Sequence, residues 1–370
     1  MIKQELCKIT CEVTSELSTS VRNGIIDCGI SFYTSQVSRT LVMHEVHPFF
    51  SFLPNTKLEE IPSEVFYFYC PREFEENVIS HISNMASLHI PGRGNIYGKN
   101  IILYTDTAIS FDYAKLSSLV KSSRSILSDL SGIHCIIQRG NGNDLGKAIL
   151  DMGIGVPTIA FGVGGGLREK LGIFRIAVPS AKEIAFLVVS SHDEEMAIKK
   201  MSESARLDQP GKGFIYSYKL SKGIINTKFF ISKNRHIASV EQIIYAIDDI
   251  KGGNQWRTKV EHKKEKNKDF KQSKMFDISI YSNEGSMSSI ITRAMANGAG
   301  GATKYEVDYV DLTDINKIVS NSREMSNLII SENIFEKIFN SLFEENIFEK
   351  SISAFIEVAD VSSAFSYIPN

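Results

Sequence analysis

HIPGRGNIY (residues 89–97) and DQPGKGFIY (residues 208–216) are two nearly identical stretches in one chain of 370 residues. Each places Pro-Gly, a cation and a second Gly before a segment that contains Ile-Tyr. Glycines on both sides of a cation allow a tight turn and leave backbone N–H groups open beside a positive charge, which suits a phosphate group. The repetition favours an anion site over an ordinary turn and indicates internal repeats.

Three further segments mark the repeats, each with a Gly followed five positions later by Thr. They are CGISFYT, MGIGVPT and NGAGGAT, which end at Thr34, Thr158 and Thr303. A strand and a helix precede each segment, with the strands at about residues 7–13, 133–138 and 276–281. The Thr begins a second strand. A third strand, an amphipathic helix and a fourth strand follow, with the helices in PREFEENVISHISNM, HDEEMAIKKMSESA and ENIFEKIFNSLFEEN,.

The order βαββαβ is that of a ferredoxin-like unit, whose helices both cover one face of the sheet. The predicted fold class is therefore α+β, with three ferredoxin-like (βαββαβ) repeats. Each sheet is left with one bare face. Three bare faces in one chain can bury against one another, which predicts an intrachain pseudo-trimer and a monomer with pseudo-threefold symmetry.

The chain divides into three repeats and two inserted pieces. A capping-box spacing at Ser239 and Gln242, an apolar helix face and a stop at Gly252 indicate a docking helix after the second repeat,. The Lys-rich stretch after it lacks apolar periodicity and reads as a solvated linker. The predicted divisions are repeat 1 at 1–125, repeat 2 at 126–232, the docking-helix extension at 233–260, the basic linker at 261–274 and a degenerate repeat 3 at 275–370.

Composition restricts the partners and the compartment. The net charge of -2 provides no global field that would recruit nucleic acid or an anionic membrane,. Five cysteines without a CxxC pair fit a reducing compartment better than a disulfide framework,. No apolar run is long enough to span a membrane, and the start has no apolar leader. We therefore expect a cytoplasmic protein that is not an integral membrane protein.

On these residues the chain resembles the PII signal-transduction family (nitrogen regulatory P-II-like proteins), most clearly over residues 131–220. Members are homotrimers of ferredoxin-like subunits that bind adenine nucleotides in the clefts between subunits. The resemblance implies a non-enzymatic regulatory protein that binds AMP, ADP or ATP between its repeats. It also implies an enzyme-regulator role, with a target enzyme or transporter contacted through the loop at 162–175.

The resemblance also assigns roles to individual residues. Gly211, Lys212 and Gly213 match the phosphate-side loop, Gly162 and Gly164 match the base of the long signalling loop, and Thr158 matches the residue that reaches the adenine. The first repeat offers Gly92, Arg93, Gly94 and Thr34 in the same roles. The third repeat keeps Thr303 but has no basic glycine loop in EKSISAF, so it could donate only the base side of a cleft.

Three alternatives remain open. The protein could be a scaffold that has lost its ligand, or an enzyme that uses the same clefts, which would need metal-binding carboxylates that the loops lack. Gly140, Gly142 and Gly146 imitate a dinucleotide fingerprint, but the spacing is GxGxxxG and the acidic residue expected about 20 residues on is missing,. Spacing alone assembles no catalytic set and no metal site.

Overall fold

A computed structural model provides the structure of the chain. It describes residues 1–46, 55–120, 126–165, 181–226, 230–231, 246–247, 250, 274–313, 320–344, 346–349 and 352–366. The predicted docking-helix extension and basic linker fall outside these residues, apart from three helical positions and Lys274. No helix among the described residues has the length and apolar character needed to cross a membrane.

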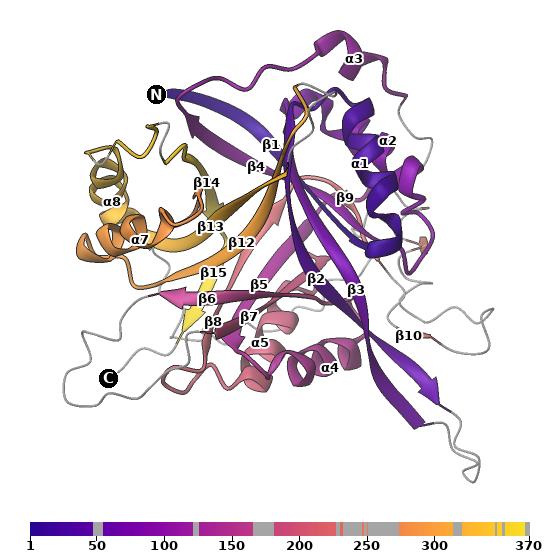
Figure 1. Cartoon of the computed structure of the whole chain (residues 1–370). Helices are drawn as coiled ribbons and strands as arrows, with labels where there is room; N and C mark the ends of the chain where they lie inside the picture. The colour runs from indigo at the N-terminus through magenta and orange to yellow at the C-terminus, as the bar shows by residue number, and fades with distance from the viewer. Residues whose placement is uncertain are drawn as a thin grey trace.

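Six elements recur in the same order in each third of the chain (Figure 1). In the first third they are β1 (Ile2–Thr14), α1 (Ser18–Asp27), β2 (Phe32–Val46), β3 (Asn55–Cys70), α2 (Glu75–Ala86) and β4 (Gly94–Thr105). In the second they are β5 (Leu130–Gln138), α4 (Gly142–Met152), β6 (Thr158–Gly165), β7 (Ala181–Ser190), α5 (Glu194–Ala205) and β8 (Gly213–Leu220). In the third they are β11 (Met275–Asn283), α7 (Met287–Ala296), β12 (Ala302–Asp311), β13 (Ser320–Ser331), α8 (Glu332–Glu344) and β14 (Phe355–Val361).

Short elements connect and flank these thirds. They are the 3-10 turns Ser15–Leu17 and Arg72–Phe74, α3 (Tyr113–Ser118), β9 (Gly223–Ile224), β10 (Phe230–Ile231) and β15 (Ser363–Ser366). Three of them pair with a strand of another third of the chain: β9 pairs with β4, β10 pairs with β2, and β15 pairs with β8. Each therefore covers the edge of a strand that precedes it by a long stretch of sequence.

The strands form one continuous sheet that closes on itself. Within the thirds the neighbours are β2-β3-β1-β4, β6-β7-β5-β8 and β12-β13-β11-β14. Between the thirds, β4 pairs with β14, β12 pairs with β6, and β2 pairs with both β12 and β6. The ladder therefore returns to its start and closes a nine-strand antiparallel barrel.

The predicted fold class of three ferredoxin-like repeats packed as a pseudo-trimer is wrong. Such repeats would be separate sheets in contact through their faces, whereas here the hydrogen-bonded ladder runs from one third into the next. The physical reason lies in the strand edges. An edge strand carries a row of unpaired N–H and C=O groups, and closure into a barrel satisfies them.

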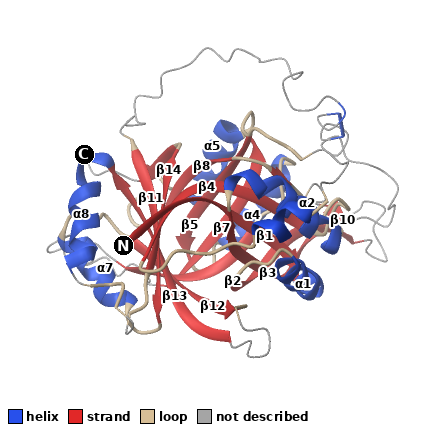
Figure 2. Ribbon diagram, turned by 90° about the horizontal axis from the view of Figure 1, so that it is seen from above, coloured by secondary structure: helices blue, strands red, loops and turns tan. Residues whose placement is uncertain are grey.

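Helices cover the outside of this barrel. The pairs α1 and α2, α4 and α5, and α7 and α8 lie at separate places around the strands (Figure 2). Alternation along the strands directs apolar residues outward to the helices and polar residues inward. In β1, Cys7, Ile9 and Cys11 belong to the core beneath the helices, while Lys8 and Thr10 line a cavity inside the barrel.

The two Pro-Gly-cation-Gly turns have a structural explanation. The first glycine of each turn has a positive φ, 96° at Gly92 and 72° at Gly211. The second glycine lies where two strands approach closely. A Cβ built on Gly94 would lie 2.0 Å from the carbonyl oxygen of Glu12, and one on Gly213 would lie 2.2 Å from that of Ile136. Backbone conformation thus explains the first glycine of each turn, and strand packing explains the second, without a ligand.

Gly213→Ala is expected to lower the free energy of unfolding by about 1–3 kcal/mol, because the new methyl group would overpack against the backbone of β5. Equilibrium denaturation in urea measures this change. Gly300→Ala is the matched control, since nothing lies within 4 Å of a Cβ at Gly300, and its effect should stay within about 0.5 kcal/mol. Equal effects of the two substitutions would contradict the close-approach explanation.

Candidate functional site

Two ion pairs lie inside the barrel. Lys8 Nζ is 2.8 Å from Glu357 Oε2, and Lys99 Nζ is 2.8 Å from Asp277 Oδ2. The side chains are 3–12% exposed. The cations come from β1 and β4 and the carboxylates from β11 and β14, so both pairs join the first third of the chain to the last.

Hydrogen bonds compensate the cost of burying these charges. Tyr69 donates to the Glu357 carboxylate, and Asn327 Nδ2 donates to Asp277 Oδ1 at 3.1 Å. Burial alone would raise the pKa of Asp277, but the ammonium of Lys99 and the hydrogen bonds from Lys99 and Asn327 hold that pKa below its ordinary value. Asp277 is therefore ionised at neutral pH and holds Lys99 in place.

His134 of β5 lies between two tyrosines of β8. Its Nδ1 is 2.7 Å from the hydroxyl of Tyr216, and its Nε2 is 2.7 Å from that of Tyr218. Desolvation lowers the pKa of His134 to about 3. The Asp277 carboxylate opposes this shift, and the ammonium groups of Lys99 and Lys8 add to it. The imidazole is therefore neutral, so one of its nitrogens donates to a hydroxyl and the other accepts.

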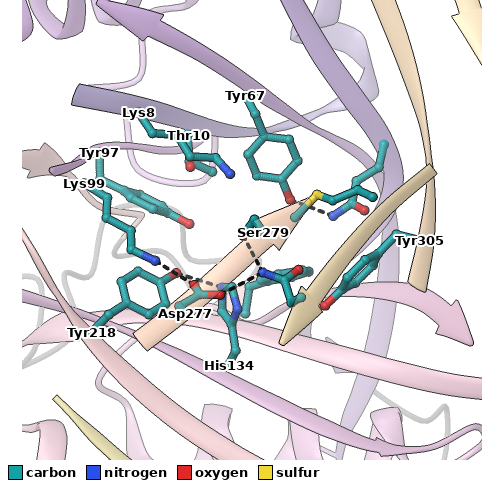
Figure 3. Close-up of a pocket in the computed structure, with 14 residues that line it drawn as sticks. Lys8, Thr10, Tyr67, Tyr97, Lys99, His134, Tyr218, Asp277, Ser279 and Tyr305 are labelled. Carbon is teal, nitrogen blue, oxygen red and sulfur yellow. Dashed lines mark hydrogen bonds and ion pairs between the residues drawn. The ribbon is translucent and has the colours of Figure 1, made fainter. Parts of the chain in front are cut away.

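A chamber of about 30 Å³ lies among these side chains. Figure 3 shows Lys99, Asp277, His134 and Tyr305 around it. This volume corresponds to about two water molecules, since one needs about 10–15 Å³ by the same measure. The chamber is too small for a metabolite.

A larger cleft of about 460 Å³ opens where β2, β6 and β12 meet. β2 pairs with β12 as far as Ser35 and with β6 from Ser38 onward. The cleft lies at this change of partner. Gln36 and Tyr305 line both the cleft and the chamber, so these two side chains stand between the two spaces.

Three cations, two carboxylates (Glu306 and Asp308) and the rings of Phe161 and Tyr305 line the cleft. Arg139, Lys182 and Lys304 line it, and the Phe161 side chain is 51% exposed. The guanidinium of Arg139 lies 5.1 Å from the centre of the Phe161 ring, and that of Arg39 lies 5.0 Å from it. Lys304 is paired with Glu324 at 2.7 Å, whereas Arg139 is exposed at the rim. The cleft combines an apolar platform with positive charge, which suits a flat ligand with an anionic group.

Of the predicted binding residues, Gly162 lines this cleft, and Gly164 and Thr303 lie next to residues that line it. Gly164 lies opposite Thr303 in the pairing of β6 with β12. The carbonyl of Gly211 accepts a hydrogen bond from Gln138 Nε2 at 3.0 Å. Because Arg139 follows Gln138, the second glycine turn adjoins the cleft, although Lys212 and Gly213 do not line it.

Two predicted threonines lie elsewhere and are buried. Thr158 donates to Glu12 Oε2 at 2.7 Å, and Thr34 lies opposite Tyr309 in the pairing of β2 with β12. These contacts tie strands of different thirds together. The predicted role of both residues at an adenine ring stays a prediction.

The first glycine turn is occupied by groups of the chain itself. The Gly92 N–H donates to Asn226 Oδ1 at 2.8 Å, and Arg93 Nε donates to the carbonyl of Ala86 at the end of α2 at 2.9 Å. A phosphate at Gly92 to Gly94 would have to displace Asn226. The two turns are thus alike in sequence but differ in what surrounds them.

The glycine-rich turn that imitates a dinucleotide fingerprint also holds an internal anion. The N–H groups of Gly140 and Gly142 donate to Glu183 Oε2 at 2.9 and 2.7 Å, and Arg39 donates to Oε1 at 2.8 Å. This carboxylate occupies the N-terminus of α4, where a pyrophosphate would bind in the dinucleotide alternative. Most of the predicted signalling loop, residues 166–175, lies outside the described residues.

Sequence reasoning missed the residues that give the interior and the cleft their chemistry. The interior charges carry only a weak signal, because Lys8, Asp277 and Glu357 occupy the polar positions of alternating strands in CKITCEV, FDISIY and FIEVA, as solvent-facing residues also do,. Arg139 and Phe161 carry none, since a cation after a strand and an aromatic residue within one are both ordinary.

No protein-family profile matches the chain, and no curated protein matches it significantly in sequence. The relationship to PII proteins therefore stays a prediction, and it no longer has the support of the fold class from which it was argued.

Lys99→Met is expected to lower the free energy of unfolding by about 3–5 kcal/mol, because it leaves the Asp277 carboxylate buried without its cation. The double variant Lys99→Met/Asp277→Leu should recover most of this loss. Denaturant titration measures both. Lys147→Met is the control, since its pair with Asp151 is 55% and 53% exposed and is worth less than about 1 kcal/mol. A double variant as unstable as the single one would contradict this account.

The protein is expected to lose stability as pH falls below the unfolded-state pKa of His134, about 6.5. The folded-state pKa is about 3, so between these values the unfolded chain binds a proton that the folded chain does not. This group contributes a loss of about 1.4 kcal/mol per pH unit. Denaturation at several pH values should show a shallower slope for His134→Gln than for the exposed His192→Gln. Equal slopes would show that His134 is not the group responsible.

Proposed function

We propose that the protein is a non-enzymatic regulatory protein that binds a small, flat, anionic ligand in the cleft between β2, β6 and β12. The observation that carries this proposal is the cleft itself, with the exposed ring of Phe161 beside the guanidinium of Arg139. A volume of about 460 Å³ lies in the range of small-molecule sites. Adenine nucleotides are the ligand class we put first, since they combine a flat base with phosphate.

Each part of such a ligand has a counterpart in the cleft. An aromatic platform favours stacking of a base, which is worth about 1–3 kcal/mol where a ring is free to receive it. The exposed guanidinium of Arg139 offers a planar set of donors that matches a phosphate. Gly164 and Thr303 lie opposite each other in the adjoining pairing of β6 with β12. Regulation would follow if a partner protein binds selectively to the form in which the cleft holds its ligand.

Calorimetric titration of the full chain with AMP, ADP, ATP and cyclic AMP tests this proposal. Arg139→Ala is expected to weaken binding of a phosphate-bearing nucleotide by about tenfold or more, because a hydrogen bond to a charged group is lost. Phe161→Ala should weaken the binding of all the nucleotides to a similar degree, because it removes the aromatic ring on which the base would stack.

Lys212→Ala is the matched control, since Lys212 does not line the cleft. It should leave the affinity unchanged. If Lys212→Ala weakens binding and Arg139→Ala does not, the ligand binds at the second glycine turn and the cleft is not its site. If no nucleotide binds, the proposed ligand class is wrong, and the scaffold alternative becomes the better account.

A further inference from the structure

The chamber inside the barrel contains a hydroxyl without a partner. Tyr305 is 3% exposed, and its hydroxyl has no hydrogen-bond partner among the described residues. Tyr305 and Lys99 stand on opposite sides of the chamber in Figure 3. A buried polar group without a partner costs about 1–3 kcal/mol, so a bound species that satisfies it is favoured.

Other side chains of the chamber have protons left to donate. Burial lowers the pKa of Lys8, and the Glu357 carboxylate opposes that shift. In the ammonium form Lys8 Nζ has three protons, and among the described residues it reaches two acceptors, Tyr281 at 2.9 Å and Glu357 at 2.8 Å,. Lys99 reaches one acceptor among the described residues, Asp277, and otherwise lies 4.0 Å from the centre of the Tyr218 ring. The Tyr67 hydroxyl accepts from Gln36 Nε2 at 2.7 Å, which leaves its own proton to donate.

Two of the acceptors that line the chamber are already in use. Asp277 accepts from Lys99 and from Asn327, and Ser279 accepts from Asn327 at 2.7 Å. Donors left without acceptors, two of them on ammonium groups, favour an anion over a cation. The walls also include Phe186 and Met325, which have no strong acceptor.

We infer that the chamber binds one small monovalent anion of the halide class, held by the hydroxyl of Tyr305 and the ammonium groups of Lys8 and Lys99. The volume of about 30 Å³ excludes phosphate esters and nucleotides but admits a single ion of chloride size. The ion would enter the chamber from the larger cleft by passing between Gln36 and Tyr305, because these two side chains line both spaces. This site is separate from the nucleotide cleft and does not depend on it.

Thermal unfolding of the full chain at fixed ionic strength tests the inference. Sodium chloride and sodium bromide should raise the midpoint of unfolding progressively with concentration, because an ion that binds only the folded state stabilises it. Sodium gluconate, whose anion is too large for the chamber, should not. Equal midpoints in all three salts would overturn the inference.

The Tyr305→Phe variant identifies the site. It removes one donor and keeps the ring, so the concentration of chloride needed for half of the stabilisation should rise about tenfold or more. Tyr309→Phe is the control, since Tyr309 is on the same strand but does not line the chamber. If the two variants respond alike, the stabilising halide binds elsewhere. Crystals grown in bromide should show an anomalous peak between Tyr305 and Lys99, and a water molecule there would overturn the inference.

Discussion

β2 pairs with four other strands, the short β10 among them, and the closed architecture depends on its pairings with β3, β12 and β6. β3 pairs with it along one edge, and β12 and then β6 pair with it along the other. Because a strand edge must satisfy its N–H and C=O groups, the change of partner between Ser35 and Ser38 joins all three thirds at one place. The cleft opens at the same place, so closure of the barrel and formation of the candidate site have a common origin.

The interior of the barrel follows from that closure. Once the sheet closes, every inward-facing side chain leaves water, and charged groups there need partners from other strands. Lys8 and Lys99 of the first third find Glu357 and Asp277 of the last. Such pairs contribute little net stability compared with apolar packing, but a strand order that separated Lys8 from Glu357 or Lys99 from Asp277 would leave buried charges unpaired. The chamber is the space these groups leave between them.

The two Pro-Gly-cation-Gly turns show how far a motif can be interpreted. In both, glycine is required by a positive φ and by the close approach of two strands. Arg93 folds back onto the end of α2, whereas Gln138 links the second turn to the neighbourhood of the cleft. The Pro-Gly-cation-Gly motif therefore forms the same turn in two different surroundings. A repeated motif is evidence for repeated local structure, and its ligand must be argued from the groups around it.

The sequence by itself determined the local elements. The strands predicted at residues 7–13, 133–138 and 276–281 lie in β1, β5 and β11, because alternation and helical periodicity are properties of neighbouring residues,. Only the tertiary structure decided that the sheets join and close, that Lys8 meets Glu357, and that Arg139 stands over Phe161. Which strand edges pair depends on groups hundreds of residues apart, and the hydrogen-bonding backbone is the same in every residue except proline. No local pattern therefore encodes that choice.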